Sequence, residues 1–222
     1  MSDPGTTDKV GEWLFQPMDE ASAREIAGWR YPPPYDFYNC PEDGVETEVL
    51  CLLNPDHLYH TVWDRGGELV GLAGFGADCR VPGGDYGADA LDVGGGLRPD
   101  RCGRGMGAGF WEAALEVARR HFAPAAFRVT VAAFNKRALR VWERLGFCVV
   151  EVFEATHSGK PFVVLVRESG EARGAASLSR AGFHTRPSEM DAERPAEVPT
   201  QSVGTRNAGD WATDSGGGYG TS

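Results

Sequence analysis

The sequence predicts an α/β (α+β) protein with a mixed central sheet, and three observations support that class. Segments with alternating apolar residues, typical of strands, are interspersed with segments whose apolar residues recur every three or four positions, typical of helices. Their predicted order is strand, helix, two or three strands, helix, strand, helix and two strands. Near residue 169 the composition changes to Gly, Ser, Ala, Pro and charged residues. We therefore expect a single domain with about six or seven strands and about four helices.

The N-terminal half contains short strands and one amphipathic helix. Residues 12–18 (EWLFQPM) are a strand candidate, and residues 19–29 begin with acidic residues and place Ile26 and Trp29 on one side, which favours a helix. Three successive prolines exclude a regular helix at the start of residues 31–40. Residues 57–64 and 67–76 are predicted strands around the turn DRGG.

The C-terminal half is predicted to contain a glycine-rich strand, two helices and three further strands. Residues 89–99 form the strand, which Pro99 ends. Helices are predicted over 107–122, with arginines in the last turn, and over 135–146, with Gly146 as the stop signal. The strands are expected at residues 127–133, 147–156 and 160–168.

Both ends of the chain differ in composition from the body. We expect a flexible N-terminus over residues 1–11, a folded domain over 12–168 and a disordered low-complexity tail over 169–222, because the tail has too little apolar surface to offset the entropy of ordering. The tail's isolated aromatics leave a second interpretation open, a peptide that docks on a partner; these aromatics are Phe183, Trp211 and Tyr219.

Bulk properties exclude several classes of protein. The formal net charge of -10 argues against a nucleic-acid binder, since phosphate contacts need a basic face. The five cysteines are scattered and form no CxxC pair or zinc-type spacing, so we expect no disulfide framework and no metal site. No signal peptide and no apolar run of about 18 residues is present, so we expect no membrane partner and a cytoplasmic location.

Residues 94–110 (GGGLRPDRCGRGMGAGF) contain seven glycines and three arginines between a strand and a helix. A helix N-terminus presents unpaired N–H groups at its positive end, and Gly103, Gly105 and Gly107 would let an anion approach them, with Arg101 and Arg104 adding charge. The glycine spacing matches neither a Walker loop nor a dinucleotide fingerprint. The glycines alone leave two interpretations open, an anion site or a tight strand-to-helix turn.

A second segment adds to this signal. The pair PDRCGRGMG and, about 28 residues later, NKRALRVWERLGF resembles the GNAT superfamily of acyl-CoA-dependent N-acyltransferases over residues 12–168. In that family a loop [Q/R]-x-x-G-x-[G/A] holds the pyrophosphate of coenzyme A, and a later helix carries N-x-x-A-x-x-x-[Y/W]-x-x-x-G-F. The helix pattern is complete in Asn135, Ala138, Trp142, Gly146 and Phe147.

The loop pattern is nearly complete. Gly105 and Gly107 occupy its glycine positions, but Cys102 stands where Gln or Arg is usual, and Arg101 lies one residue early. The segments WRYPPPYDFY and LDVGGGLRPD also resemble a subgroup of the family. That subgroup implies no particular acceptor.

The resemblance implies an N-acetyltransferase that moves an acetyl group from acetyl-CoA, its co-substrate, to a primary amine of a small molecule or peptide by direct attack. The glycine end of the strand should splay from its neighbour and pair with pantetheine. Lys136 or Arg137 would reach the adenosine phosphates, or would be solvated helix charges. The implied cofactor-binding residues are Gly96, Leu97, Arg98, Arg101, Cys102, Gly103, Arg104, Gly105, Met106, Gly107 and Asn135.

Catalytic roles are less well defined. Asp92 is our candidate base, with a structural carboxylate that caps a turn or pairs with an arginine as the alternative; further candidates are Glu48, Asp89 and His60. The family's usual acid, a Tyr, is replaced by Trp142, whose indole is too weak an acid, so Trp142 is either a hydrogen-bond donor to sulfur or a core residue. Water or one of three tyrosines would then protonate the thiolate; these are Tyr31, Tyr35 and Tyr38.

Residues 29–40 are expected either to form the wall of an acceptor site or simply to pack on the sheet. The candidate acceptor-binding residues are Trp29, Tyr31, Tyr35, Asp36 and Tyr38. Two alternatives to the enzyme remain: a catalytically degenerate acyl-CoA-binding sensor or interaction module, and self-acylation of Cys102 if its helix N-terminus lowers the thiol pKa. We expect a monomer or homodimer.

Overall fold

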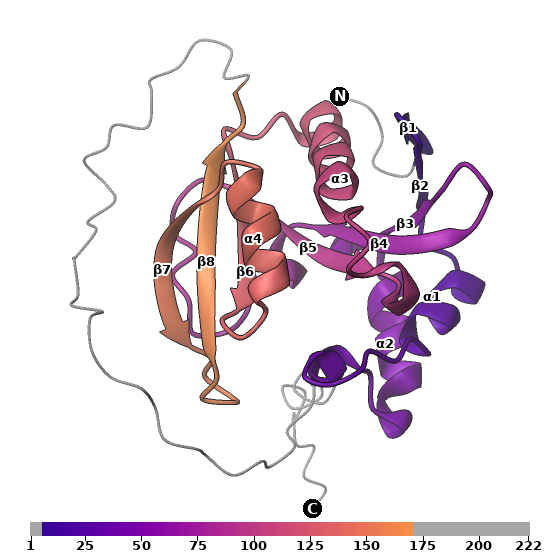
Figure 1. Cartoon of the computed structure of the whole chain (residues 1–222), viewed down its shortest axis with the longest axis horizontal. Coiled ribbons are helices and arrows are strands. Elements are labelled where there is room, and N and C mark those ends of the chain that lie inside the picture. The colour runs from indigo at the N-terminus through magenta and orange to yellow at the C-terminus, as the bar shows by residue number, and fades with distance from the viewer. Residues whose placement is uncertain (1–5, 171–222) are drawn as a thin grey trace, which may run out of the picture.

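The structure is a computed structural model that describes residues 6–170 (Figure 1). Its eight strands form one mixed sheet in the order β1-β2-β3-β4-β5-β6-β8-β7. All neighbours are antiparallel except β5 and β6. The strands are β1 (Asp8–Val10), β2 (Trp13–Pro17), β3 (His60–Trp63), β4 (Leu69–Phe75), β5 (Leu91–Leu97), β6 (Ala126–Ala132), β7 (Cys148–Glu154) and β8 (Pro161–Glu168).

Four α-helices accompany the sheet within residues 6–170, so the predicted fold class is confirmed, with eight strands where six or seven were expected. The helices are α1 (Glu20–Ala27), α2 (Val45–Leu53), α3 (Gly107–Phe122) and α4 (Lys136–Arg144). Short 3₁₀ turns connect them: η1 (Tyr35–Tyr38), η2 (Glu42–Gly44), η3 (Pro55–His57), η4 (Ala77–Cys79) and η5 (Pro99–Arg101).

Two elements lie where the sequence predicted none. The strand β1 begins at Asp8, inside the segment expected to be flexible, because it pairs with β2 through Val10↔Trp13. The helix α2 was not predicted, and no side-chain cap marks its start at Gly44. The tail predicted over 169–222, with its three aromatics, lies outside the described residues except for Ser169 and Gly170.

The helices pack in two pairs. The helices α3 and α4 contribute Phe110, Leu115 and Trp142 to the larger hydrophobic cluster, together with residues of β2, β4 and β6. The helices α1 and α2 bury Ile26 and Leu52 in a second cluster. In Figure 1, α4 lies across β6 and β8, while α1 and α2 lie below β3 and β4. The larger cluster therefore spans strands from both halves of the sheet, whereas α1 and α2 pack against residues of β4.

The two halves of the sheet meet at a fork between β5 and β6. These parallel strands pair only at Leu91↔Phe127 and Asp92↔Arg128. Beyond that point β5 continues to pair with β4 as far as Leu97, and β6 continues with β8 as far as Ala132. The facing edges of residues 93–97 and 129–132 are thus unpaired with each other. The splay implied by the family resemblance is present.

Candidate functional site

A run of backbone N–H groups lies open at the end of β5. Within the described chain, none of the N–H groups of residues 103–109 donates a hydrogen bond to a protein acceptor. The first bond of α3 is from Phe110 N to Met106 O, at 3.0 Å, and no side chain caps the helix. Such a run at a helix N-terminus attracts anions, because the N–H groups and the helix dipole present positive charge to the same point.

Glycine occupies positions in this loop for two separate physical reasons. Gly103 and Gly105 have φ of +75° and +79°, a left-handed conformation that disfavours any side chain. A Cβ at Gly105 would meet no atom within 4 Å, so the conformation and not the space requires glycine there. At Gly107 a Cβ would lie 3.2 Å from Val141 Cγ2, so glycine permits close packing of α3 on α4. The loop is therefore both a tight turn and a surface of exposed amides.

Two arginines supply uncompensated positive charge near this loop. Arg104 is exposed and has no ion pair within residues 6–170. The Arg137 guanidinium lies 3.6 Å from the centroid of the Tyr35 ring, and its Nη1 is 3.9 Å from where a Cβ of Gly103 would be. Arg104 thus lies on the loop itself and Arg137 lies beside it, both without an acidic partner in the described structure.

The other two arginines of the segment are engaged in ion pairs. Arg98 donates to Asp100 at 2.7 Å and to the Leu69 carbonyl at 2.8 Å. Arg101 pairs with Asp64 at 3.6 Å and with Asp100 at 3.5 Å. These contacts fix the turn that follows β5, so Arg98 and Arg101 shape the loop instead of adding free charge to it.

The backbone of β5 has one edge committed to β4. The Arg98 N–H donates to Val70 O at 2.8 Å, and the Gly76 N–H donates to Asp92 O at 2.9 Å. Backbone groups of successive residues point to opposite edges of a strand, so Gly96 shares this edge with Asp92 and Arg98. The Leu97 carbonyl points the other way, toward the fork.

Two tyrosines span the fork between the C-terminal ends of β5 and β6. Tyr31 Oη donates to the Leu97 carbonyl at 2.8 Å, and Asn135 Nδ2 donates to Tyr38 Oη at 3.1 Å. The two tyrosine rings are 6.5 Å apart in an edge-on arrangement. Asn135 Oδ1 accepts from the Ala138 N–H at 3.1 Å, which caps α4. The predicted cofactor residues Leu97 and Asn135 are thus brought together with Tyr31 and Tyr38.

The other three residues predicted for the wall of the acceptor site have different positions. Tyr35 lies under Arg137, close to the loop. Trp29 is 8% exposed and belongs to the α1/α2 cluster, so its ring is part of the core. Asp36 lies in η1 and has no ion pair within the described chain.

The structure corrects the prediction that Asp92 is the base. Asp92 is 2% exposed, and its carboxylate accepts hydrogen bonds from Arg128 Nε at 2.6 Å, Arg128 Nη2 at 2.8 Å and Arg80 Nε at 2.7 Å. Two guanidinium groups therefore occupy both oxygens of the carboxylate. The geometry supports the alternative, a structural carboxylate paired with arginine.

Trp142 likewise has a structural position. It is 2% exposed, and its ring lies 4.7 Å from that of Trp111 and 4.9 Å from that of Phe147. This position supports the second of the two roles considered for Trp142, a residue of the hydrophobic core. Among the other base candidates, His60 is 3% exposed and packs on Phe75, Glu48 is half-buried on α2, and Asp89 is exposed.

Cys102 does not have the lowered pKa that self-acylation requires. Burial raises the pKa of the Cys102 thiol, and the opposing effect of the Arg137 charge is smaller. The sulfur lies 3.5 Å from the Leu97 carbonyl and 3.6 Å from the Arg98 carbonyl, to which the protonated thiol donates. The self-acylation hypothesis is therefore not supported.

Sequence reasoning missed one cluster of reactive side chains. Cys51, His57 and Asp78 meet although they come from α2, η3 and η4. Their spacing matches no metal-ligand motif, and α2 itself was not predicted, so the sequence held no signal for this contact. Within residues 6–170, no helix combines the length and apolar character needed to cross a membrane.

Comparison with known proteins places this geometry in a family. The model of the Acetyltransferase (GNAT) family matches residues 16–147, more than half of the chain. A search of curated proteins found no match.

Solved structures show the same fold at low sequence identity. A GNAT-family acetyltransferase from Bacillus anthracis is 15% identical, with a TM-score of 0.60 over 75% of this chain and 100% of that one. A putative GNAT-family acetyltransferase from Bordetella pertussis is 21% identical, with a TM-score of 0.57 over 73% and 99%. A mutant of the spermidine N-acetyltransferase SpeG from Vibrio cholerae is 14% identical, with a TM-score of 0.53 over 72% and 95%. The chain therefore belongs to the GNAT family of acetyltransferases.

Proposed function

We propose that this protein is an N-acetyltransferase that moves an acetyl group from acetyl-CoA to a primary amine of a small molecule or peptide by direct attack. The run of open N–H groups at residues 103–109 is the observation that carries the proposal. A pyrophosphate suits this loop because it is a compact dianion, and Arg104 and Arg137 add the positive charge that it needs.

The fork supplies the second part of a coenzyme A site. The edge of β5 that carries the Leu97 carbonyl is not paired with β6, so an extended pantetheine arm could add to it as a strand would. Gly96 and Arg98 direct their backbone groups to β4, which favours Leu97 over them as the pairing residue. In this arrangement coenzyme A would extend from the fork to the loop, alongside residues 95–107.

Tyr38 is the residue that we assign to protonation of the departing thiolate. Asn135 Nδ2 donates to Tyr38 Oη at 3.1 Å, and this hydrogen bond would stabilise the phenolate that proton transfer leaves behind. Tyr31 is less suited because its hydroxyl proton is directed at the Leu97 carbonyl, at 2.8 Å.

Tyrosine variants separate these roles. Tyr38→Phe should lower kcat by about 10²-fold or more while the KM for acetyl-CoA changes little, since a general acid typically contributes that much. Tyr35→Phe is the comparison variant, because it removes only the hydroxyl and keeps the ring that stacks under Arg137; a loss of kcat in Tyr35→Phe and not in Tyr38→Phe would make Tyr35 the acid. Equal activity of the Tyr38→Phe variant and the unaltered protein would exclude Tyr38 as the acid.

One observation favours the alternative, an acyl-CoA-binding sensor. The first candidate for the base, Asp92, and the residue at the family's usual acid position, Trp142, are both buried in structural contacts. Release of free CoA from acetyl-CoA in the presence of a mixed panel of small amines and peptides distinguishes the two functions. Amine-dependent release supports the enzyme. Tight binding of acetyl-CoA, with no release of free CoA in the presence of any of the amines, supports the sensor.

A further inference from the structure

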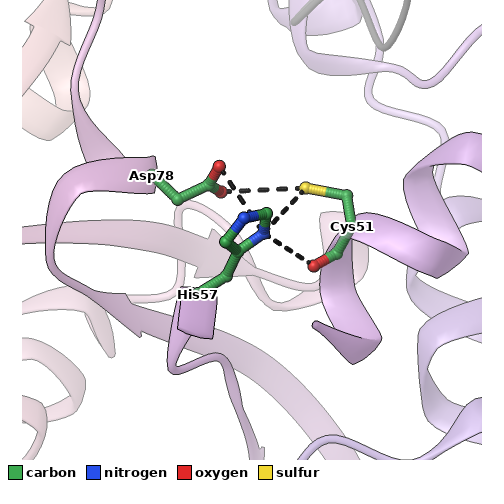
Figure 2. Close-up of side chains that lie close together, drawn as sticks. All are labelled: Cys51, His57 and Asp78. Atoms are coloured by element: carbon green, nitrogen blue, oxygen red, sulfur yellow. Dashed lines mark hydrogen bonds and ion pairs between the residues drawn. The ribbon is translucent and has the colours of Figure 1, made fainter. Parts of the chain in front are cut away.

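Three side chains with metal-binding chemistry, Cys51, His57 and Asp78, point toward one another (Figure 2). Cys51 Sγ lies 3.4 Å from His57 Nδ1 and 3.8 Å from Asp78 Oδ2. His57 Nδ1 lies 3.6 Å from Asp78 Oδ1. The His57 and Asp78 side chains are 25% and 11% exposed, so the cluster is sheltered but reachable from solvent.

We propose that Cys51, His57 and Asp78 bind a divalent transition metal ion of the Zn²⁺ class, with water as the fourth ligand. Zinc bonds of about 2.0–2.3 Å to S, N and O place tetrahedral ligand atoms about 3.4–3.6 Å apart. The Cys51 Sγ–His57 Nδ1 separation of 3.4 Å lies in this range, and each Asp78 oxygen is close to one of these atoms, Oδ1 at 3.6 Å from Nδ1 and Oδ2 at 3.8 Å from Sγ. One oxygen of the carboxylate, the sulfur and one ring nitrogen all lie within 4.8 Å of one another. A thiolate, an imidazole and a carboxylate suit Zn²⁺ better than Mg²⁺ or Ca²⁺, which prefer oxygen alone.

The arrangement is unlike a nucleophilic relay. In a Cys-His-Asp relay the thiol faces one ring nitrogen and the carboxylate faces the other. Here both Cys51 Sγ and Asp78 face Nδ1 of His57. Donors that converge on one point are suited to holding a cation between them.

Neighbouring groups already orient two of the ligands. Tyr59 Oη donates to Asp78 Oδ2 at 2.6 Å, and Asn54 Nδ2 lies 3.1 Å from His57 Nε2. In the metal-free state His57 Nδ1 also lies 2.9 Å from the Cys51 carbonyl, so the ring proton sits on Nδ1 and Nε2 accepts from Asn54.

Metal binding changes this proton arrangement. The Cys51 thiol releases its proton to solvent, and the His57 proton moves from Nδ1 to Nε2 through exchange with solvent. The Asn54 amide must then turn its oxygen toward Nε2, although that oxygen now accepts from the Asp56 N–H at 3.1 Å. A carboxylate at position 54 would accept both hydrogen bonds at once.

The site would tie α2 and η3 to the turn that supports the fork. Asp78 lies in η4, and two residues later Arg80 donates to Asp92 at 2.7 Å, beside the last paired position of β5 and β6. A bound ion would therefore stabilise the fold without contact with the proposed coenzyme A loop.

Titration of the full chain with Zn²⁺, followed by equilibrium dialysis and metal analysis, tests the site. We expect one equivalent of Zn²⁺, an increase in Tm, and a thiolate charge-transfer band when Co²⁺ replaces Zn²⁺. Cys51→Ser and Asp78→Asn should each weaken binding by at least about tenfold. Cys148→Ser, at an exposed cysteine, is the matched control and should bind as the unaltered protein does.

Asn54→Asp keeps the proposal testable even if the other variants fail to fold. It should tighten Zn²⁺ binding by about tenfold, the size of a second-shell effect, because the carboxylate can hold the Nε2 proton. No saturable Zn²⁺ binding by the unaltered protein, or a Co²⁺ band that disappears in Cys148→Ser and persists in Cys51→Ser, would overturn the proposal.

Discussion

Asp92 shows how a residue can lie at the predicted position and still have a different role. Its place on β5 follows from the sequence, and the two-residue period of a strand puts it on the same face as Gly94 and Gly96. Its partners do not follow, because Arg80 and Arg128 are 12 and 36 residues away in the chain. Only the fold brings two guanidinium groups to one carboxylate.

The Asp92→Asn variant separates structure from catalysis. Removing the carboxylate leaves the Arg128 guanidinium, whose side chain is 2% exposed, without its partner. Loss of one member of a buried ion pair typically costs about 3–5 kcal/mol, so urea unfolding should show a loss of that size. Asp100→Asn, at a half-exposed carboxylate paired with Arg98, should change stability little. If Asp92→Asn kept its stability but lost turnover, Asp92 would again be the candidate for the general base.

Cys102 provides a prediction about thiol reactivity. Because burial raises the pKa of this thiol, it stays protonated at pH values at which ordinary thiols begin to ionise. Alkylation with iodoacetamide at pH 8, followed by peptide mass spectrometry, should modify the exposed Cys148 well before Cys102. The difference should shrink as the pH rises and Cys102 ionises. Faster modification of Cys102 would contradict its assignment as a buried, inert thiol.

At the scale of elements, the N-terminus of α3 makes the most direct prediction. A Cβ at Gly109 meets no atom within 4 Å, and helical side chains point back toward the N-terminus. Gly109→Glu therefore places a carboxylate beside the open N–H groups, where it competes with a bound phosphate. We expect at least about a tenfold loss of acetyl-CoA affinity, roughly the effect of 1.4 kcal/mol.

Gly109→Ala is the matched control for this variant. It adds a side chain without charge and should leave affinity unchanged while stabilising α3 by about 0.5–1 kcal/mol. Gly107 is a poorer position for the test, because a side chain there approaches Val141 and would disturb the packing of α3 on α4. Equal affinities of Gly109→Glu and Gly109→Ala would show that the loop does not hold the phosphates.

The elements themselves differ in how visible they are in the sequence. The helix α4 is predictable because Asn135 caps it, Gly146 follows it, and its apolar residues form one stripe. The helix α2 (VETEVLCLL) is not predictable in this way. Its last five residues are apolar without a polar face between them, and Gly44 provides no side-chain cap. The strand β1 is only three residues long and exists through its pairing with β2.

At the scale of the whole molecule, the sequence predicts the order of most strands and helices, and its family resemblance implies a splay at the glycine end of β5, but the exact residue at which the sheet opens is not predicted. The fork arises because β5 and β6 stop pairing after Asp92 and Arg128, and that depends on the path of both strands. The contacts of Tyr31 with Leu97 and of Tyr38 with Asn135 join positions 66 and 97 residues apart. Such contacts have no local signature, so the sequence could name these residues but only the structure shows which of them meet.

The central claim, that the open loop and the fork together form a coenzyme A site, is tested most directly by calorimetric titration of the full chain. Acetyl-CoA, ATP and NAD are titrated in parallel under the same conditions. The account predicts that acetyl-CoA alone binds, at one site and with a Kd in the micromolar range, about -8 kcal/mol. No binding of acetyl-CoA, or equal binding of all three nucleotides, would contradict it and reduce residues 103–109 to a turn between a strand and a helix.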